Sequence, residues 1–334
     1  MQIQSEAPAG PVRERAARSA AFGLSLEVDP SIEIPGISRT SDVDAPALAS
    51  QVGAPTRVRL DPRELQRRWS SAEQVPTRVR ELRDGATVLL TVELAPSAGY
   101  LLRAPGFGRI LIAPDGTELL CDPEPESSEW TMLLPAQALP LAATLRGYEV
   151  LHASGVVLGG RAALFAGQTG AGKSSLAAAL LCRGAALLSD DTVALEPREG
   201  KLIAHPGAAL LQLQAAEHER LSARERAILG APTTVLGKQR YSPSVTASPA
   251  PFGELFLLER SGYGPPIERI EAVDPFALLA STFNLSVRTP ERLTRHLDLA
   301  VALAATGRIH RLRVQPEMDA TQLAEIVHER LLEP

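Results

Sequence analysis

A glycine-rich segment of eight residues, Gly167–Ser174, constrains the fold of this chain more than any other feature. It matches the pattern G-x-x-x-x-G-K-[ST] at every defined position, follows the apolar run 162–166 and precedes an expected helix over 174–182. Strand, loop and helix in this order are the context of a phosphate-binding P-loop. A second apolar run, 155–158, and a third, 185–188, complete the expected strands. We therefore predict a βαβ unit within an α/β domain.

The P-loop predicts residues that bind ATP and Mg²⁺. Glycines let backbone N–H groups turn toward phosphate oxygens, and the helix start adds its positive dipole end. Lys173 would contact the β and γ phosphates, and the Ser174 hydroxyl is suited to Mg²⁺. The predicted nucleotide-binding residues are Gly167, Gln168, Thr169, Gly170, Ala171, Gly172, Lys173, Ser174 and Ser175.

An acidic pair, Asp190 and Asp191, ends the apolar run 185–188. Carboxylates at the C-terminal edge of a strand beside the P-loop strand point at bound metal and phosphate. One of them could hold Mg²⁺, while the other could accept the proton of an attacking hydroxyl. The alternative interpretation is a solvated turn. The P-loop just upstream favours the functional one.

Around this unit the pattern predicts a P-loop kinase domain with a central β-sheet, preceded by a small β-rich region. The expected organisation is a flexible tail over 1–21, a β-rich N-terminal region with a connecting helix over 22–147, and a catalytic domain over 148–334. Further strands are expected at 192–195 and 254–258, and a mobile Ser-, Pro- and Thr-rich loop at 233–251. Helices are expected at 133–146, 215–229, 276–283, 291–305 and 321–332.

Composition favours a cytoplasmic protein. The formal net charge of −5 gives no sign of a broad basic face for nucleic acid, and the two cysteines supply neither a disulfide framework nor a metal site. The N-terminus lacks the apolar stretch of a signal peptide, and no run of about 18 apolar residues predicts a membrane span. We thus expect neither nucleic acid nor membrane among its partners, and a homo-oligomer is possible.

Three segments together resemble the HPr kinase/phosphorylase family, and more closely its truncated serine kinase-like relatives, which include lasso-peptide kinases. They are 151–154 with His152, the P-loop, and 189–191, and the offsets between them are similar to those of the family. The resemblance implies that Lys173 binds phosphate, that Ser174 binds the metal, and that Asp191 is the catalytic base. Asp190 is then the second predicted metal ligand. It also implies that His152 lies against the phosphate.

Two departures from the family bear on the reaction. The bifunctional members carry a further metal-binding Glu downstream, whereas the segment 205–213 supplies none, and neither Glu196 nor Glu217 aligns clearly. The Pro-Gly-Arg element linked to the reverse reaction is not evident after Phe252. We therefore expect a kinase that works in the forward direction only.

The predicted function is transfer of the γ-phosphate of ATP to a Ser or Thr hydroxyl of a peptide, protein or small-molecule acceptor resembling an amino acid. The alternatives are a P-loop kinase of small metabolites, and a nucleotide-dependent switch or ATPase without kinase activity. Lys238 and Arg240 are candidate substrate contacts that fit a solvated basic turn equally well, and Arg288 is equally open.

Overall fold

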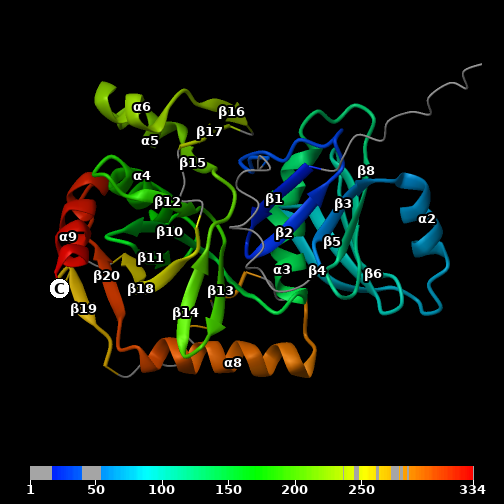
Figure 1. The fold of residues 1–334 in the computed structure, drawn as a ribbon. Coiled ribbons are helices and arrows are strands. Elements are labelled where there is room, and N and C mark those ends of the chain that lie inside the picture. The colour runs from blue at the N-terminus through cyan, green and yellow to red at the C-terminus, as the bar shows by residue number, and fades with distance from the viewer. Residues whose placement is uncertain are drawn as a thin grey trace, which may run out of the picture.

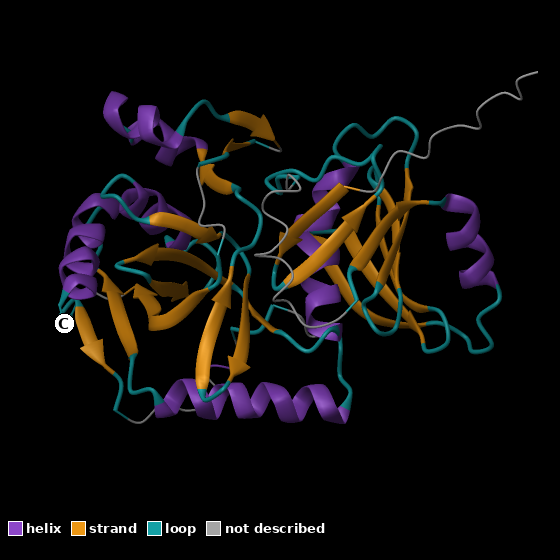
Figure 2. Cartoon of the chain, viewed as in Figure 1, coloured by secondary structure: helices purple, strands orange, loops and turns teal. Residues whose placement is uncertain are grey.

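A computed structural model of the chain describes residues 17–39, 54–235, 237–243, 248–260, 263–271, 278, 281–283 and 286–333. These residues form a mixed α/β structure with sheets of eight, nine and three strands. Figure 1 shows the two large sheets side by side, and Figure 2 shows the helices packed around them.

The N-terminal region is built on the eight-stranded sheet, whose spatial order is β1-β2-β3-β8-β7-β6-β5-β4. Its strands are β1 (Ala17–Ala21), β2 (Leu24–Val28), β3 (Thr56–Leu60), β4 (Thr77–Asp84), β5 (Thr87–Ala95), β6 (Gly99–Ala104), β7 (Gly108–Ile112) and β8 (Glu118–Pro123). The prediction of a tail over 1–21 is wrong for its last five residues. They form β1, which pairs with β2 along its whole length.

Helices cover both faces of this sheet. A 3₁₀ turn, η1 (Trp130–Met132), leads into a π-helix, η2 (Leu134–Ala138), and then into α3 (Leu139–Leu145), which agrees with the helix expected at 133–146. Alternate buried residues of the strands pack on this helical segment in one hydrophobic core. The other face packs on α2 (Pro62–Ser70), which places the fully buried Leu65 against Leu101, Leu111 and Leu120.

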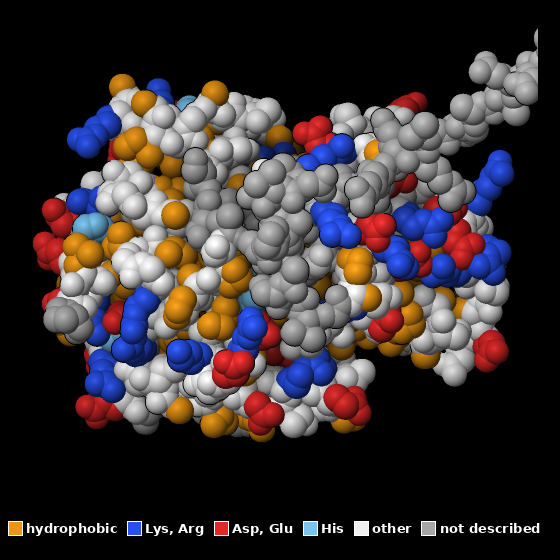
Figure 3. Space-filling model, in the orientation of Figure 1, with side chains coloured by type: hydrophobic (Ala, Val, Ile, Leu, Met, Phe, Trp, Pro, Cys, Tyr) orange, Lys and Arg blue, Asp and Glu red, His pale blue; other side chains and the backbone are white. Residues whose placement is uncertain are grey.

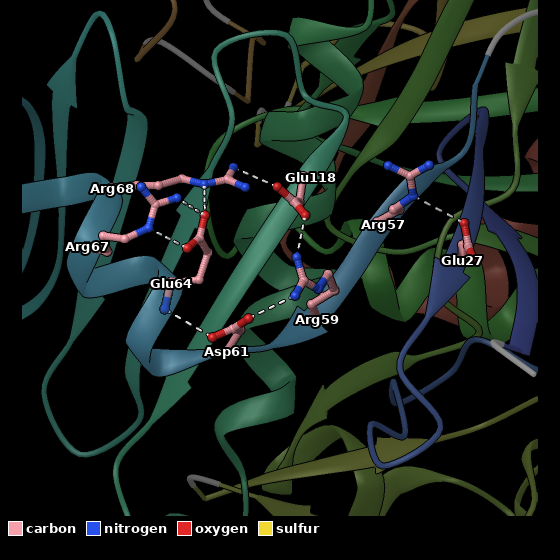
Figure 4. Close-up of polar contacts among 8 residues, drawn as sticks. All are labelled: Glu27, Arg57, Arg59, Asp61, Glu64, Arg67, Arg68 and Glu118. Carbon is pink, nitrogen blue, oxygen red and sulfur yellow. Dashed lines mark hydrogen bonds and ion pairs between the residues drawn. The ribbon is translucent and has the colours of Figure 1, made fainter. Parts of the chain in front are cut away.

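Sequence reasoning did not anticipate α2, which is a strongly charged helix. Figure 4 shows its start, where the Asp61 carboxylate accepts a hydrogen bond from the Glu64 backbone N–H at 3.0 Å and so caps the helix. Glu64 also pairs with Arg67 and Arg68 on the following turn, and Arg68 reaches Glu118 on β8 at 2.6 Å. Exposed pairs of this kind contribute little each, so the buried Leu65 is the main anchor of α2.

The C-terminal region is built on the nine-stranded sheet. Its main path runs β12-β10-β11-β18-β14-β13-β9, with β20 paired to β18 and β19 paired to β20. The strands are β9 (Glu149–Leu151), β10 (Ala153–Leu158), β11 (Arg161–Ala166), β12 (Ala186–Ser189), β13 (Val193–Arg198), β14 (Lys201–His205), β18 (Ala250–Arg260), β19 (Ile267–Arg269) and β20 (Ile309–Val314).

Three helices sandwich this sheet. The P-loop helix α4 (Lys173–Leu181) and α9 (Ala320–Leu332) cover one face, and α8 (Pro290–Ala305) covers the other. These agree with the helices expected at 174–182, 321–332 and 291–305. The helix expected at 276–283 lies mostly outside the described residues. Within that span Leu278 is helical, whereas Thr282 forms an isolated β-bridge with Leu151.

The remaining elements form a small layer above α4 (Figure 1). The third sheet has the order β15 (Leu211–Gln214), β17 (Lys238–Tyr241) and β16 (Thr233–Val235), and two helices, α5 (Ala215–Arg220) and α6 (Ala223–Leu229), follow β15. The single helix expected at 215–229 is thus broken. The Ser222 hydroxyl starts α6 by accepting the Glu225 N–H at 3.2 Å. The mobile loop expected at 233–251 is wrong where β16, β17 and the start of β18 lie, while positions 236 and 244–247 fall outside the described residues.

The two regions share one hydrophobic core, because Val150, Ala194 and Val287 pack with the N-terminal sheet and α3. Backbone bonds also join them, from Phe22 N–H to the Pro206 carbonyl at 2.7 Å and from Ala209 N–H to the Gly36 carbonyl at 2.6 Å. The proposed boundary between residues 147 and 148 stays a prediction.

None of the helices in the described part of the chain is long and apolar enough to cross a membrane. On the face shown in Figure 3, basic and acidic side chains over the N-terminal region lie interspersed.

Candidate active site

The segment 167–172 joins β11 to α4, and its glycines, Gly167, Gly170 and Gly172, all have positive φ angles. Gly172 sits immediately before α4 with a φ of 100°, in the left-handed region that favours glycine. The free N–H groups of the first turn of α4 therefore open toward the loop. The apolar β11 and the helix-forming run of alanines and leucines in α4 hold the two ends of the loop in place.

Lys173 is the first residue of α4 and is buried, with 6% of its surface exposed. Its ammonium group donates to the carbonyls of Gly167 at 2.9 Å and Gln168 at 3.2 Å. Burial lowers the pKa of Lys173, while Asp191 and Asp190 oppose that shift. The ammonium group is thus held over the loop 167–172 by two of the loop's own carbonyls.

Asp190 follows β12, and its carboxylate accepts three hydrogen bonds. Its Oδ1 accepts the hydroxyls of Ser154 at 2.5 Å and Ser174 at 2.9 Å, and its Oδ2 accepts the backbone N–H of Gln212 at 3.2 Å. Burial, followed by the charge of Asp191, raises the pKa of Asp190 to about 6. The structure therefore brings together the two residues predicted to bind metal, Ser174 and Asp190.

The strand that carries the acidic pair is not a direct neighbour of the P-loop strand. The strand that carries the acidic pair was expected beside the P-loop strand, but β10 lies between β12 and β11 and pairs with both. The reason is the tight hairpin of β10 and β11, which places β10 on the edge of β11 that the crossover strand would otherwise occupy. Because β10 is antiparallel to both neighbours, β11 and β12 still run parallel, and Asp190 still reaches Ser174.

Asp191 differs sharply from its neighbour. It is exposed, and its φ of 65° is a left-handed conformation that is unusual for a residue other than glycine. Strained residues of this kind are concentrated at functional sites. Its side chain borders a cleft that also contains Asp190 and His152.

His152 is half-buried and lines the same cleft as Thr169 of the P-loop. Its Nδ1 is 3.0 Å from the Asp191 carbonyl oxygen, and its backbone N–H donates to the Ser281 carbonyl at 2.6 Å. Burial lowers the pKa of His152, and the charge of Lys173 adds to the shift. Both effects favour the neutral imidazole.

The cleft has a volume of about 780 Å³ and lies between the two regions. Thr169 of the loop 167–172 is one of its lining residues, so this loop borders the cleft. The N-terminal region contributes Phe22, Arg80, Met132 and Gln137, and the C-terminal region contributes His152, Asp190, Asp191, Gln212, Phe283 and Arg288.

Several residues around the site escaped sequence reasoning. Ser154 and Gln212 hold Asp190, and Arg260 at the end of β18 donates to the Gly170 carbonyl of the P-loop at 2.7 Å. Arg80 on β4 and Phe22 in the turn between β1 and β2 are far away in sequence. No local motif marks these positions, and the strand pairing that brings them here was not predicted.

The two candidate substrate contacts do not line the cleft themselves, although Arg240 lies beside Gln212, which does. Lys238 and Arg240 both sit on β17, where Arg240 is paired in register with Gln212. Arg240 is half-buried, and its Nε finds no hydrogen-bond partner among the described residues. Arg288, by contrast, borders the cleft.

The two glutamates considered as additional metal ligands differ in their position relative to the P-loop. Glu196 contacts His205 Nε2 at 3.0 Å, on β13 and away from the P-loop. Glu217 on α5 accepts a hydrogen bond from the Ser175 hydroxyl, next to Ser174. Of the two, Glu217 is therefore the one near the P-loop.

The residues present fit a Mg²⁺ ion that arrives with a nucleotide. Within the described part of the chain, no three His, Cys, Asp or Glu side chains cluster so as to hold a metal alone. One carboxylate and one hydroxyl, Asp190 and Ser174, are in contact, and Mg²⁺ commonly takes one or two carboxylates and completes its shell with phosphate oxygens and water. The half-buried Asp190 carboxylate forms no ion pair with a described Lys or Arg, so a cation would favour its charged form.

Comparisons with known proteins add little to this geometry. No protein-family model matches the chain, and no curated protein matches it. One similar solved structure is the Hpr(Ser) kinase/phosphatase from Coxiella burnetii, with 14% sequence identity and a TM-score of 0.30 over 55% of this chain and 97% of that chain. A likeness at this level carries no argument, so the functional case rests on the site.

Proposed function

We propose that this protein is an ATP-dependent kinase that transfers the γ-phosphate to a Ser or Thr hydroxyl of a peptide, protein or amino-acid-like acceptor. The observation that carries the proposal is the contact between Asp190 and Ser174 beside a complete P-loop, with Asp191 bordering the adjoining cleft. The P-loop supplies a place for the nucleotide, and the cleft supplies a place for an acceptor.

Each residue has a role in this proposal. Lys173 exchanges its bonds to the Gly167 and Gln168 carbonyls for the phosphate oxygens, and Ser174 and Asp190 hold Mg²⁺, which neutralises phosphate charge when bound. Asp191 accepts the proton of the attacking hydroxyl, since it is the exposed carboxylate of the pair. His152, whose Nδ1 contacts the Asp191 carbonyl oxygen, keeps that residue in its left-handed conformation.

We also propose that the enzyme works in the kinase direction only and that it is located in the cytoplasm. The chain lacks an evident Pro-Gly-Arg element after Phe252, which supports the kinase direction alone. A cytoplasmic location agrees with the composition.

The test separates binding from chemistry through Asp191→Asn. This variant should bind Mg-ATP within a few-fold of the wild type, because the Asp191 carboxylate forms no hydrogen bond or ion pair with Lys173 or Ser174 in the structure and acts on Lys173 only through its charge. Phosphoryl transfer should fall about 10²–10⁴-fold, the usual contribution of a general base. Transfer is measured with labelled ATP and pooled serine and threonine peptides and free amino acids.

Asp84→Asn, at an exposed strand end in the N-terminal region, is the control and should behave like the wild type. Near-normal transfer by Asp191→Asn would move the base role elsewhere. ATP binding without transfer to any hydroxyl acceptor would favour the switch or ATPase alternative.

A further inference from the structure

Arg80 on β4 is a half-buried cation that borders the cleft from the N-terminal side. Its Nη1 donates to the Gln137 side-chain oxygen at 3.2 Å, and its guanidinium carbon lies 5.6 Å from the centre of the Phe283 ring. Among the described residues, no Asp or Glu forms an ion pair with it. Two neighbours on the same strand, Arg78 and Arg83, both pair with Glu81.

This arrangement is costly for a purely structural arginine. Burial lowers the pKa of Arg80, and no carboxylate counters that shift. An arginine side chain has five N–H donors. In Arg80, one of them forms a hydrogen bond with a described residue, Gln137. Gln137 and Phe283 fix the plane of the guanidinium, and an aromatic ring stabilises a cation without using its N–H donors. The remaining donors are therefore available to a ligand in the cleft.

The position of Arg80 places this donor group on the acceptor side of the site. The Phe283 ring is near both Arg80 and His152, and its centre is 6.5 Å from that of the His152 ring. The charge of Arg80 is also near enough to help lower the pKa of His152. The P-loop has its own cations in Lys173 and Arg260, which contact loop carbonyls directly. Arg80 comes from the opposite wall and contacts no loop residue in the described structure.

We propose that Arg80 is the anion-binding residue of the acceptor site, and that the acceptor carries a carboxylate or a phosphate close to its reacting hydroxyl. A planar guanidinium fixed on one side suits either group, because both present two oxygens to its fork of donors. This inference rests on the proposed kinase function. It assigns the N-terminal region a role in recognition, since that region supplies both Arg80 and Gln137.

The test measures binding without catalysis. Pooled serine and threonine peptides are made in three matched forms: a C-terminal acid, a C-terminal amide, and an amide with a phosphoserine beside the acceptor residue. Binding to the full chain, saturated with Mg²⁺ and a non-hydrolysable ATP analogue, is measured by calorimetry for the wild type, Arg80→Gln, Arg80→Lys and Arg78→Gln. Thermal unfolding checks that each variant is folded.

The wild type should bind one anionic form about 10–100-fold more tightly than the amide, as expected for a charged hydrogen-bonded contact. The preferred form identifies the source of the anion. Arg80→Gln should abolish the preference and leave affinity for the ATP analogue unchanged, Arg80→Lys should retain part of it, and Arg78→Gln should match the wild type.

Two results would overturn the inference: equal binding of all three forms by the wild type, or a loss of ATP-analogue affinity in Arg80→Gln as large as the loss of peptide affinity. The second result would place Arg80 on the nucleotide phosphates instead. If the wild type prefers an anionic peptide but never phosphorylates it, the anion site stands and the kinase proposal fails.

Discussion

Gly207 illustrates how single residues shape the site. A Cβ atom at this position would lie 2.0 Å from Ser189 Oγ and 2.8 Å from Phe22 Cε1, and its N–H donates to the Leu188 carbonyl at 3.0 Å. Because Gly207 has no side chain, the segment after β14 can pack closely against the end of β12. The Gln212 N–H then lies within hydrogen-bonding distance of Asp190. A side chain here would push the segment away.

We therefore expect Gly207→Ala to lower the free energy of unfolding by about 1–3 kcal/mol, as overpacking of a dense interior does. Denaturant unfolding followed by circular dichroism measures the loss. An unchanged midpoint and slope would show that the segment can move without cost, and that Asp190 does not depend on it.

At the scale of elements, a buried ionic network fastens α8 to β9. Glu149 on β9 is 1% exposed and lies 3.2 Å from Arg292 and 2.9 Å from His296, both on α8. His296 Nε2 lies 2.6 Å from the Thr282 hydroxyl, so the network also fixes the segment that carries Phe283 and accepts the His152 N–H. The cleft wall thus depends on helix docking.

Glu149→Gln should destabilise the protein by about 3–5 kcal/mol, because Arg292, which is 2% exposed, would keep its charge without a carboxylate. The exposed Asp298→Asn on the same helix is the matched control and should change stability by less than about 0.5 kcal/mol. Thermal and denaturant unfolding measure both. Equal stability of the two variants would mean that α8 is held by its apolar contacts alone.

At the scale of the whole molecule, stability should depend on pH through a buried histidine in the central sheet. His310 on β20 is 2% exposed and stacks on Phe256 at 5.3 Å, and burial, with Arg330 and Arg269, lowers its pKa to about 4. Glu254 lies 3.3 Å away but is paired with Arg330, which offsets its effect. The folded state therefore resists protonation of His310.

The sign of the pH effect follows from this lowered pKa. A histidine in the unfolded chain has a pKa of about 6.5, so its stabilising contribution is complete above that pH and is lost as the pH falls toward 4. His310→Gln should have a flatter profile of unfolding free energy between pH 6.5 and 4 than the wild type. Parallel profiles for the two proteins would contradict the lowered pKa.

The sequence predicts those parts of the fold that local patterns encode. The P-loop, its flanking strand and helix, and α8 and α9 follow from motif and periodicity, and the same reasoning singled out the residues that meet around Ser174. Pairing between distant strands has no local signature. For this reason β1, the strand β10 between β11 and β12, and the β17 ladder were missed or misplaced.

The same limit applies to the site. His152, Asp190 and Asp191 were identified by their spacing from the P-loop, and the structure places all three along one cleft. Arg80 and Phe283 lie about 70 residues before and 130 after His152, so no spacing argument reaches them. Their catalytic and binding roles stay predictions.

The central claim is that Gly167–Ser174 binds the phosphates of ATP, and calorimetry of ATP and Mg²⁺ binding tests it most directly. Wild-type protein should bind and be stabilised by about 2.7 kcal/mol at a free ligand concentration of 100 Kd. Lys173→Ala should lose most of this effect, since Lys173 is the buried cation over the loop, whereas Lys201→Ala, exposed on β14, should keep it. Folded wild-type protein that binds no nucleotide would contradict the account.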